Sequence, residues 1–352
     1  ASVAPFRPPW WLRSAHLQTL WPTLVRRRVR VAVRTEHLEL PDGDFLDLAW
    51  SDSGRAPLVV LLHGLEGGGR SAYAGGMLAA LGAAGCGAVL MHFRGCGEDL
   101  NRLPRSYHSG ETGDFGYLLE ILTARFPGRP LAAVGYSLGG NVLLKWLGEQ
   151  GDAAPLAAAA AVSVPFDLAD AADRLERGAS RLYQWWLVRQ LQAKVRAKVE
   201  RGLLPGHFRD AVRWRTFRAF DEHVTAPLHG FAGAADYYAR ASSRQYLPRI
   251  RVPTLVVHAL DDPFMTPRAV PDAAELPAAV TLELTPGGGH VGFVTGAWPW
   301  RPRYWLESRV PVFLAARLQD PGAGATRPSA GGSATARRWS RLRRAHGHGR
   351  RL

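Results

Sequence analysis

Short apolar runs alternate along the chain with stretches of helical periodicity. Each run is continuous, as expected for a parallel strand that helices cover on both faces. Helices that connect such strands form right-handed crossovers, so the pattern predicts an α/β fold with a doubly wound, mostly parallel sheet. The predicted strands are 57–62, 87–92, 130–134, a segment within 156–164, 252–259 and 280–284, and the predicted helices are 72–84, 114–125, 140–147 and 302–318.

Two further segments alternate between apolar and polar residues, which is the pattern of strands with one exposed face. They span residues 28–40 and 45–50 and are separated by the turn Pro41-Asp42-Gly43-Asp44. We expect an antiparallel hairpin at one edge of the sheet. Upstream, Ser14 is a candidate N-cap for a short helix, in a segment rich in proline and tryptophan that packs across the domain.

Residues 167–249 interrupt the alternation with a helical, charged segment that is rich in aromatic residues. Because predicted core strands lie on both sides of this segment, we interpret it as an inserted helical cap. A cap in this place forms the roof of a pocket. Residues 1–318 are then a single domain with the cap at about 167–249, and residues 319–352 form a tail.

The composition is that of an ordinary globular protein, since 47% of the 352 residues are hydrophobic and 21% are charged. The two cysteines, Cys86 and Cys96, are too few for a disulfide framework and suit a reducing compartment. Residues 1–7 lack an apolar signal-peptide core, and the longest apolar run, 153–166, is too short to cross a bilayer. We therefore expect a cytoplasmic protein.

The net charge of +14 raises nucleic acid or an acidic membrane as a partner. Residues 319–352 hold eight arginines and one aspartate, so this segment alone carries +7. Its Gly, Ala and Ser content predicts disorder. We interpret it as a solvated basic tail, with weak contact to a polyanion or to the inner face of the membrane as the alternative. We predict no specific nucleic-acid site, and the oligomeric state is left open.

The pentapeptide Gly135-Tyr136-Ser137-Leu138-Gly139 lies where a predicted strand gives way to a predicted helix. A serine on such a tight turn is held in a strained conformation. Glycines flank it because a Cβ there would collide with the neighbouring strand or helix. The serine hydroxyl projects from the end of the sheet, at the positive end of a helix dipole. Ser137 is therefore a candidate nucleophile, and the alternative is a turn without chemistry.

Acyl transfer through a serine needs a base and a carboxylate that orients the base. Both residue types follow Ser137 in the required order, because Asp261 and Asp262 come after the strand 252–259 and His290 comes after the next strand. We assign Ser137, Asp262 and His290 as a catalytic triad. Asp262 is preferred because the acid usually lies several residues beyond the strand end, and Asp261 stays open.

The tetrahedral intermediate of this reaction needs two backbone N–H donors for its oxyanion. We expect one from Leu138, directly after the nucleophile, and one from Leu65 in the loop His63-Gly64-Leu65-Glu66-Gly67. The loop lacks the Lys-Ser/Thr ending of a P-loop and the spacing of a dinucleotide site, which disfavours a phosphate cradle. We expect His63 to make a structural hydrogen bond. No residue cluster predicts a metal site or a cofactor.

These motifs resemble a known family. The chain is similar to the YheT-type branch of α/β-fold hydrolases, the type 4 α/β-hydrolase family, whose eukaryotic relatives are lipase-like esterases. The resemblance implies an α/β-hydrolase fold with a charge-relay triad of Ser137, Asp262 and His290, and hydrolysis of carboxylic esters. The tail beyond Leu318 departs from the family pattern. The matching segments are 14–19, 63–67, 92–97, 101–112, 135–141, 261–265 and 288–293.

The loop from Arg94 to Glu111 matches a family signature whose role does not follow from its residues. Its arginines and His108 could hold an anionic head group, or they could form salt bridges that pin the loop. Cys96 in this loop has no partner base placed by the sequence, so we interpret it as a packed or free thiol.

The sequence thus predicts a serine hydrolase for a small-molecule carboxylic ester, with an acyl-enzyme intermediate. The aromatic cap suits short- to medium-chain or lipid-like esters. One alternative keeps the chemistry and changes the acyl donor or acceptor, as in a thioesterase, an acyltransferase or an acylglycerol lipase. The other is a non-catalytic binding protein docked by its basic tail, since fold alone does not establish function.

Overall fold

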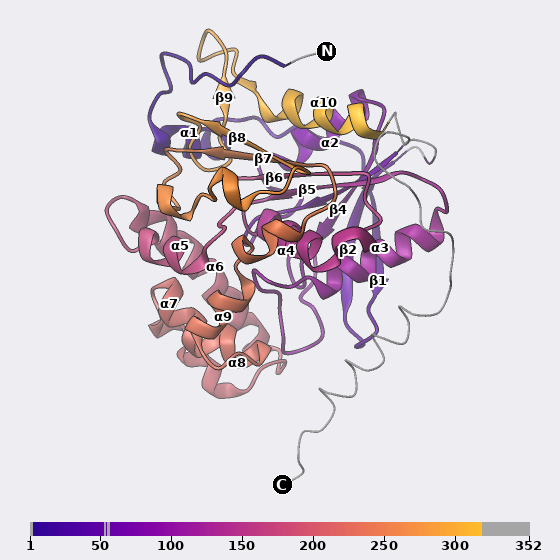
Figure 1. The fold of residues 1–352 in the computed structure, drawn as a ribbon. Helices are drawn as coiled ribbons and strands as arrows, with labels where there is room; N and C mark the ends of the chain where they lie inside the picture. Colours follow the sequence, from indigo (N-terminus) through magenta and orange to yellow (C-terminus); the bar gives the residue numbers. More distant parts are fainter. Residues whose placement is uncertain (1–2, 53, 55–56, 319–352) are drawn as a thin grey trace. The chain divides into compact units, whose positions relative to one another are not determined.

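The computed structural model describes residues 3–52, 54 and 57–318 (Figure 1). The prediction of a disordered basic tail at 319–352 lies outside the described residues.

An eight-stranded sheet forms the centre of the structure, in the order β1-β2-β4-β3-β5-β6-β7-β8. The strands from β4 to β8 in this order are parallel to one another, and β2 pairs with both of its neighbours antiparallel. The predicted doubly wound, mostly parallel sheet is therefore confirmed. The strands are β1 (Arg34–Glu39), β2 (Phe45–Ser51), β3 (Leu58–Leu62), β4 (Gly87–His92), β5 (Leu131–Tyr136), β6 (Ala158–Val162), β7 (Thr254–Ala259) and β8 (Val280–Thr285).

Helices cover the sheet on both faces, as the continuous apolar strands predict. In β3, Leu58 and Val60 pack into the core formed with α3 (Gly113–Arg125) and α4 (Leu138–Gln150). The alternate residues Val59 and Leu61 pack into the core formed with α2 (Ala74–Ala83) and α10 (Leu306–Leu318). Figure 1 shows α2 and α10 on one side of the sheet and α3 and α4 on the other.

The edge hairpin forms as predicted, but its first strand is shorter than the sequence pattern. β1 and β2 pair antiparallel with Glu39 opposite Phe45, and β1 lies at the sheet edge. β1 begins at Arg34 rather than at residue 28 because β2, its pairing partner, ends at Ser51 and pairs only as far back as Arg34.

The N-terminal and C-terminal segments also differ in detail from the prediction. α1 (Ala15–Leu24) follows Ser14 directly, but the Ser14 side chain makes no capping hydrogen bond. α10 begins at Leu306 and not at residue 302, because Arg303–Tyr304 is the short strand β10, which pairs with β9 (Val294–Thr295).

A helical segment separates β6 from β7. It contains α5 (Leu168–Leu175), α6 (Ser180–Glu200), α7 (Phe217–Phe220), α8 (Ala226–His229) and α9 (Ala234–Ala241), with a π-helical turn at Asp221–Thr225 between α7 and α8. One small apolar core of its own joins α6 to the following turns, and a second joins α5 to α9. Figure 1 shows these helices gathered together to one side of the central sheet.

Candidate active site

Ser137 occupies a strained turn between β5 and α4. Its φ and ψ are +51° and −118°, a conformation that costs a non-glycine residue about 1–3 kcal/mol. The flanking glycines cannot carry side chains, since a Cβ on Gly135 would lie 2.4 Å from the Gly139 carbonyl oxygen and one on Gly139 would lie 2.5 Å from the His63 carbonyl oxygen. The backbone N–H of Ser137 donates to Val162 of the neighbouring strand at 2.8 Å. The sheet thus fixes the turn that holds the hydroxyl.

His290 lies on the loop after β8, within hydrogen-bond distance of the serine. Its Nε2 is 2.9 Å from Ser137 Oγ. The backbone N–H of His290 donates to Thr19 Oγ1 of α1 at 2.9 Å. The Phe264 ring stacks on the imidazole, with 3.9 Å between ring centroids and 3° between ring planes. The ring is therefore oriented by backbone, stacking and hydrogen-bond contacts together.

The two adjacent aspartates after β7 have different partners. Asp262 Oδ2 lies 2.9 Å from His290 Nδ1, and its other oxygen accepts the Phe264 backbone N–H at 2.8 Å. Asp261 instead accepts the backbone N–H of Gly289 at 2.9 Å, and burial raises the pKa of its carboxyl above the ordinary value. Asp262 is thus placed to orient the imidazole, whereas Asp261 holds the loop that carries it.

Two backbone N–H groups near Ser137 make no hydrogen bond to another described residue. A Cβ on Gly64 would lie 3.3 Å from Ser137 Cβ, so the loop after β3 approaches the serine closely. The next residue, Leu65, and Leu138 at the start of α4 both line the pocket at Ser137. Within the described chain, neither Leu65 nor Leu138 donates its backbone N–H in a hydrogen bond. Both N–H groups are therefore available as hydrogen-bond donors to a group in the pocket.

His63 holds the loop through hydrogen bonds, as predicted. Its Nδ1 lies 2.6 Å from the Gly64 carbonyl oxygen, and its Nε2 accepts the backbone N–H of Phe93 at 3.1 Å. Complete burial lowers the pKa of His63 to about 3. The imidazole is therefore neutral, with Nδ1 as donor, and is not a base for the reaction.

A buried polar cluster connects α6 to the same loop. Lys194 Nζ lies 2.7 Å from Glu66 Oε1, and the Tyr107 hydroxyl donates to the same oxygen at 2.7 Å. Lys194 Nζ also lies 3.0 Å from Cys96 Sγ. Burial raises the pKa of the Cys96 thiol to about 11, so the thiol is protonated and weakly nucleophilic at neutral pH. These contacts fix the position of Glu66, directly after Leu65.

The loop from Arg94 to Glu111 is pinned by ion pairs. The Arg94 guanidinium donates to both oxygens of Asp114 at 2.7 Å and also contacts Asp44 at 3.1 Å. Arg102 pairs with Glu39 at 2.6 Å, and Arg105 pairs with Glu111. Burial lowers the pKa of His108 to about 3, so this side chain carries no charge. Of the two roles open from the sequence, the contacts favour salt bridges over an anion site.

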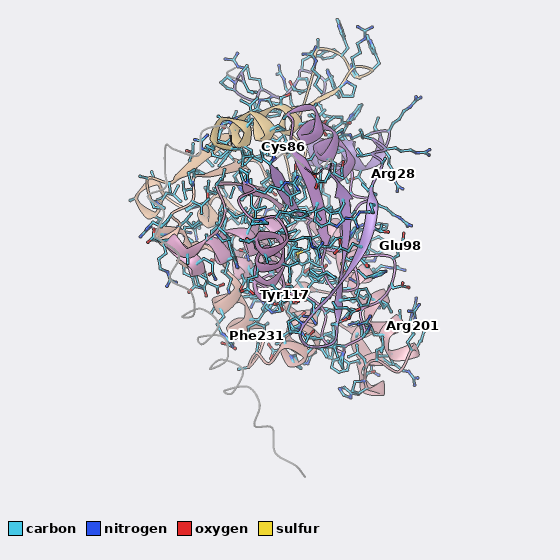
Figure 2. All side chains as sticks on the ribbon, turned by 90° about the vertical axis from the view of Figure 1, so that its right-hand side faces the viewer. Arg28, Cys86, Glu98, Tyr117, Arg201 and Phe231 are labelled. Carbon is cyan, nitrogen blue, oxygen red and sulfur yellow. The ribbon has the colours of Figure 1, made fainter. Side chains whose placement is uncertain are left out.

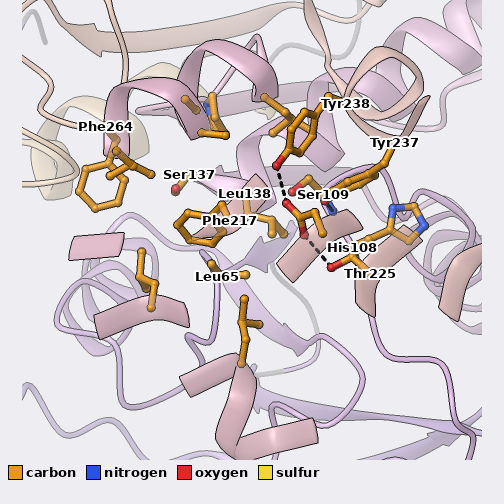
Figure 3. A pocket seen from close by; sticks show the side chains of 18 of the residues that line it. Leu65, His108, Ser109, Ser137, Leu138, Phe217, Thr225, Tyr237, Tyr238 and Phe264 are labelled. Carbon is orange, nitrogen blue, oxygen red and sulfur yellow. Dashed lines mark hydrogen bonds between the residues drawn. The ribbon is translucent and has the colours of Figure 1, made fainter. Parts of the chain in front are cut away.

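The pocket above Ser137 is mostly apolar and has a volume of about 120 Å³. Its roof comes from the segment between β6 and β7. In Figure 3, Phe264 and Ser137 lie on one side of the pocket and Tyr237 and His108 on the other. Its apolar lining includes Leu65, Leu138, Pro165, Leu168, Ala171, Ala172, Leu175, Leu187, Leu191 and Phe217. In the described part of the chain, no group of three or more His, Cys, Asp or Glu side chains could hold a metal ion.

Asp221 is a carboxyl in this lining that sequence reasoning missed. It begins the π-helical turn after α7, a geometry that often occurs at functional sites. The Thr225 and Tyr238 hydroxyls each donate to one of its oxygens, at 2.6 and 2.8 Å (Figure 3). Burial, which outweighs these hydrogen bonds, raises the pKa of Asp221 to about 6. No local sequence signal marks it, because the pocket wall is assembled from separate helices.

Asp221 should make stability pH-dependent. Because its pKa is about 6 in the folded chain and about 3.8 when exposed, the folded chain binds more protons between these values. The contribution of the protonated Asp221 carboxyl to the free energy of unfolding is therefore fully present below about pH 4. It is lost as the pH rises through about 6. Relative to Asp221→Asn, the wild-type free energy of unfolding should fall by about 3 kcal/mol across this range. Urea denaturation of both proteins from acid to neutral pH measures the difference, and parallel curves would contradict it.

Comparisons with known proteins agree with this geometry. The family model for the alpha/beta hydrolase fold matches residues 57–297. YheT of Escherichia coli (strain K12), which is provisionally designated an esterase, is 44% identical over 91% of this chain and 95% of its own. The phospholipase ABHD3 of Mus musculus is 30% identical over 89% of this chain and 79% of its own. A structure of the Pyrococcus furiosus esterase Pf2001 is 17% identical and aligns with a TM-score of 0.54 over 90% of this chain and 100% of that one. The chain therefore belongs to the α/β hydrolase family.

Proposed function

We propose that the protein is a serine hydrolase that cleaves carboxylic esters through an acyl-enzyme intermediate. The observation that carries this proposal is the chain of contacts from Ser137 Oγ through His290 to Asp262, with 2.9 Å at each step. A serine hydroxyl is activated when a base lies within hydrogen-bond distance of it and a carboxylate orients that base. The names of the relatives, esterase and phospholipase, support the same reaction class.

In the first half-reaction, Ser137 Oγ attacks the ester carbonyl carbon while His290 Nε2 takes the hydroxyl proton. Asp262 keeps the other ring nitrogen, Nδ1, protonated and stabilises the imidazolium that forms. The backbone N–H groups of Leu65 and Leu138 donate to the oxyanion of the tetrahedral intermediate. The intermediate collapses when His290 returns the proton to the leaving alcohol, and the acyl group stays on Ser137.

In the second half-reaction, water replaces the alcohol in the pocket. His290 removes a proton from this water, which attacks the acyl carbon, and a second oxyanion forms at the same two N–H groups. His290 then protonates Ser137 Oγ as the acid leaves. The same base and the same donors therefore serve both steps.

The pocket supports an apolar acyl or alkyl chain as the substrate's larger part. Leucine, alanine and aromatic side chains dominate its lining, and burying each methylene of a chain there contributes about 0.8 kcal/mol. The segment 167–249 would act as the cap that keeps water from this chain. We therefore propose short- to medium-chain or lipid-like esters as substrates.

A panel of p-nitrophenyl esters of increasing acyl length tests the proposal. We expect kcat/KM to rise with chain length until the pocket is filled. A fluorophosphonate should then label the peptide that contains Ser137 and abolish turnover in proportion to labelling. Ester turnover that persists in fully labelled protein, or the absence of both turnover and labelling, would contradict the proposal and favour a non-catalytic binding protein.

A further inference from the structure

Segments near the two ends of the described chain lie side by side next to the candidate site. The Gln18 side chain on α1 bonds to both backbone groups of Val294 on β9, at 2.8 and 2.9 Å. The indole N–H of Trp10 donates to the Ala297 carbonyl at 3.1 Å. α1 and the turn after β9 therefore form one surface.

The start of α6 adjoins α1 on the side of the pocket. His16 Nδ1 on α1 lies 3.0 Å from the Tyr183 hydroxyl on α6. The Tyr183 ring contacts Phe264, with 5.0 Å between centroids, and Phe264 stacks on His290. Three segments of the chain therefore lie along one side of the site, namely residues 3–33, 177–199 and 286–306. They are called the three segments below.

These segments expose most of the large hydrophobic side chains on the described surface. Of the large hydrophobic residues that the described chain exposes, all but Val212, Leu260 and Leu284 lie on them. Apolar side chains gathered in this way mark an interaction site, whereas scattered ones need no explanation. Among the 11 tryptophans of the described residues, five are at least 49% exposed, and all five lie here: Trp10, Trp185, Trp186, Trp298 and Trp300.

α1 exposes apolar residues to solvent and buries a polar one. Leu17, Leu20 and Leu24 repeat at helical spacing and are 52%, 37% and 75% exposed. The same helix buries Gln18, a polar residue. The described residues therefore cover the leucine face of α1 only in part.

The polar residues of the three segments carry charge of one sign. Residues 3–33, 177–199 and 286–306 contain no aspartate or glutamate, and they hold 12 arginines and two lysines in total. The side chains of both lysines and of Arg26 are largely buried, so only the remaining arginines can contribute positive charge to the surface. Within the described structure, Arg13, Arg27 and Arg28 make no ion pair. Figure 2 shows Arg28 at the outer edge of the molecule. Unpaired positive charge therefore accompanies the exposed leucines and valines of residues 3–33.

We infer that this surface, the exposed apolar and basic side chains of the three segments, docks the protein on an anionic lipid bilayer. Tryptophan favours the region between head groups and acyl chains, and arginine is attracted to anionic head groups. A bilayer presents an apolar interior and negative charge over one plane, which matches three segments that contain exposed apolar side chains and arginines and no acidic residue. No described helix is long and apolar enough to span a membrane.

Docking would bring the pocket mouth to the bilayer, where lipid-like esters are concentrated. The inference does not rest on the proposed ester hydrolysis, because the docking side chains include none of Ser137, Asp262 and His290. Binding can therefore be measured without turnover.

The test is flotation of the full chain with phosphatidylcholine vesicles, with and without phosphatidylglycerol. We expect flotation only with the anionic vesicles. The double variants Trp298→Ser/Trp300→Ser, Leu17→Ser/Leu24→Ser and Arg27→Gln/Arg28→Gln should each bind about tenfold or more weakly. The 319–352 segment is present in every variant, so its contribution is the same throughout.

Leu284→Ser and Arg251→Gln are the matched controls, because both residues are exposed and lie outside the three segments. Both should bind anionic vesicles like the wild type, and the melting temperatures of all variants should stay near the wild-type value. Wild-type chain that does not float, or surface variants that float as well as the wild type, would overturn the inference. The inference would also be overturned if the surface variants lost binding to duplex DNA to the same extent as binding to anionic vesicles. That result would indicate recognition of negative charge alone.

Discussion

Replacing Ser137 by alanine should lower kcat for p-nitrophenyl esters by about a millionfold. The change removes the only atom that can form the acyl-enzyme, while the oxyanion donors and the pocket keep a small residual rate. Since Ser137 Oγ has His290 Nε2 as its partner at 2.9 Å, alanine at this position leaves the imidazole without a proton to accept. Initial rates at saturating ester and covalent labelling by a fluorophosphonate measure the effect, and both should be lost together.

Ser109→Ala is the matched control, because it removes a hydroxyl from the same pocket lining without touching the triad geometry. Its kcat should stay within about tenfold of the wild type. If Ser137→Ala kept a substantial fraction of the wild-type rate, the nucleophile would lie elsewhere or the ester would react without one. The chain would then be a poor candidate for a serine hydrolase.

The sequence predicts the position of Ser137 well because the constraint on it is local. A Cβ on Gly135 would collide with Gly139 inside the strand-to-helix turn, and one on Gly139 would collide with His63 just after the neighbouring strand β3. The strands, too, could be found from their apolar runs. Even β6, whose alanines favour a helix in isolation, is a strand because every one of its residues is buried between β5 and β7.

The sequence pattern does not predict contacts between distant parts of the chain. Asp221 enters the pocket from a π-helical turn, and Lys194 reaches Glu66 across 128 positions of the chain. Neither contact has a periodicity or spacing that predicts it, because each depends on how the helices after β6 pack over the core. The exposed leucines of α1 show the same limit, since helical spacing alone does not say which face is buried.

Asp262→Asn should lower kcat by about 10⁴-fold, whereas Asp261→Asn should change it by less than about tenfold. Asparagine cannot stabilise an imidazolium, and its amide can donate to Nδ1, which would leave the proton on Nε2, the nitrogen that must accept from Ser137. At position 261 the side chain only accepts the Gly289 N–H, and the carbonyl oxygen of asparagine can do the same. The paired variants therefore separate orientation of the base from support of its loop.

The pH–rate profile adds an independent readout to this pair. If Asp262 orients His290, kcat of Asp262→Asn should recover at high pH, where hydroxide substitutes for the misoriented base, while Asp261→Asn should keep the wild-type profile. Equal losses in the two variants, or a larger loss in Asp261→Asn, would mean that the acid of the triad is Asp261. The contact at 2.9 Å between Asp262 and His290 would then be a structural one, and the loop would have to rearrange when ester binds.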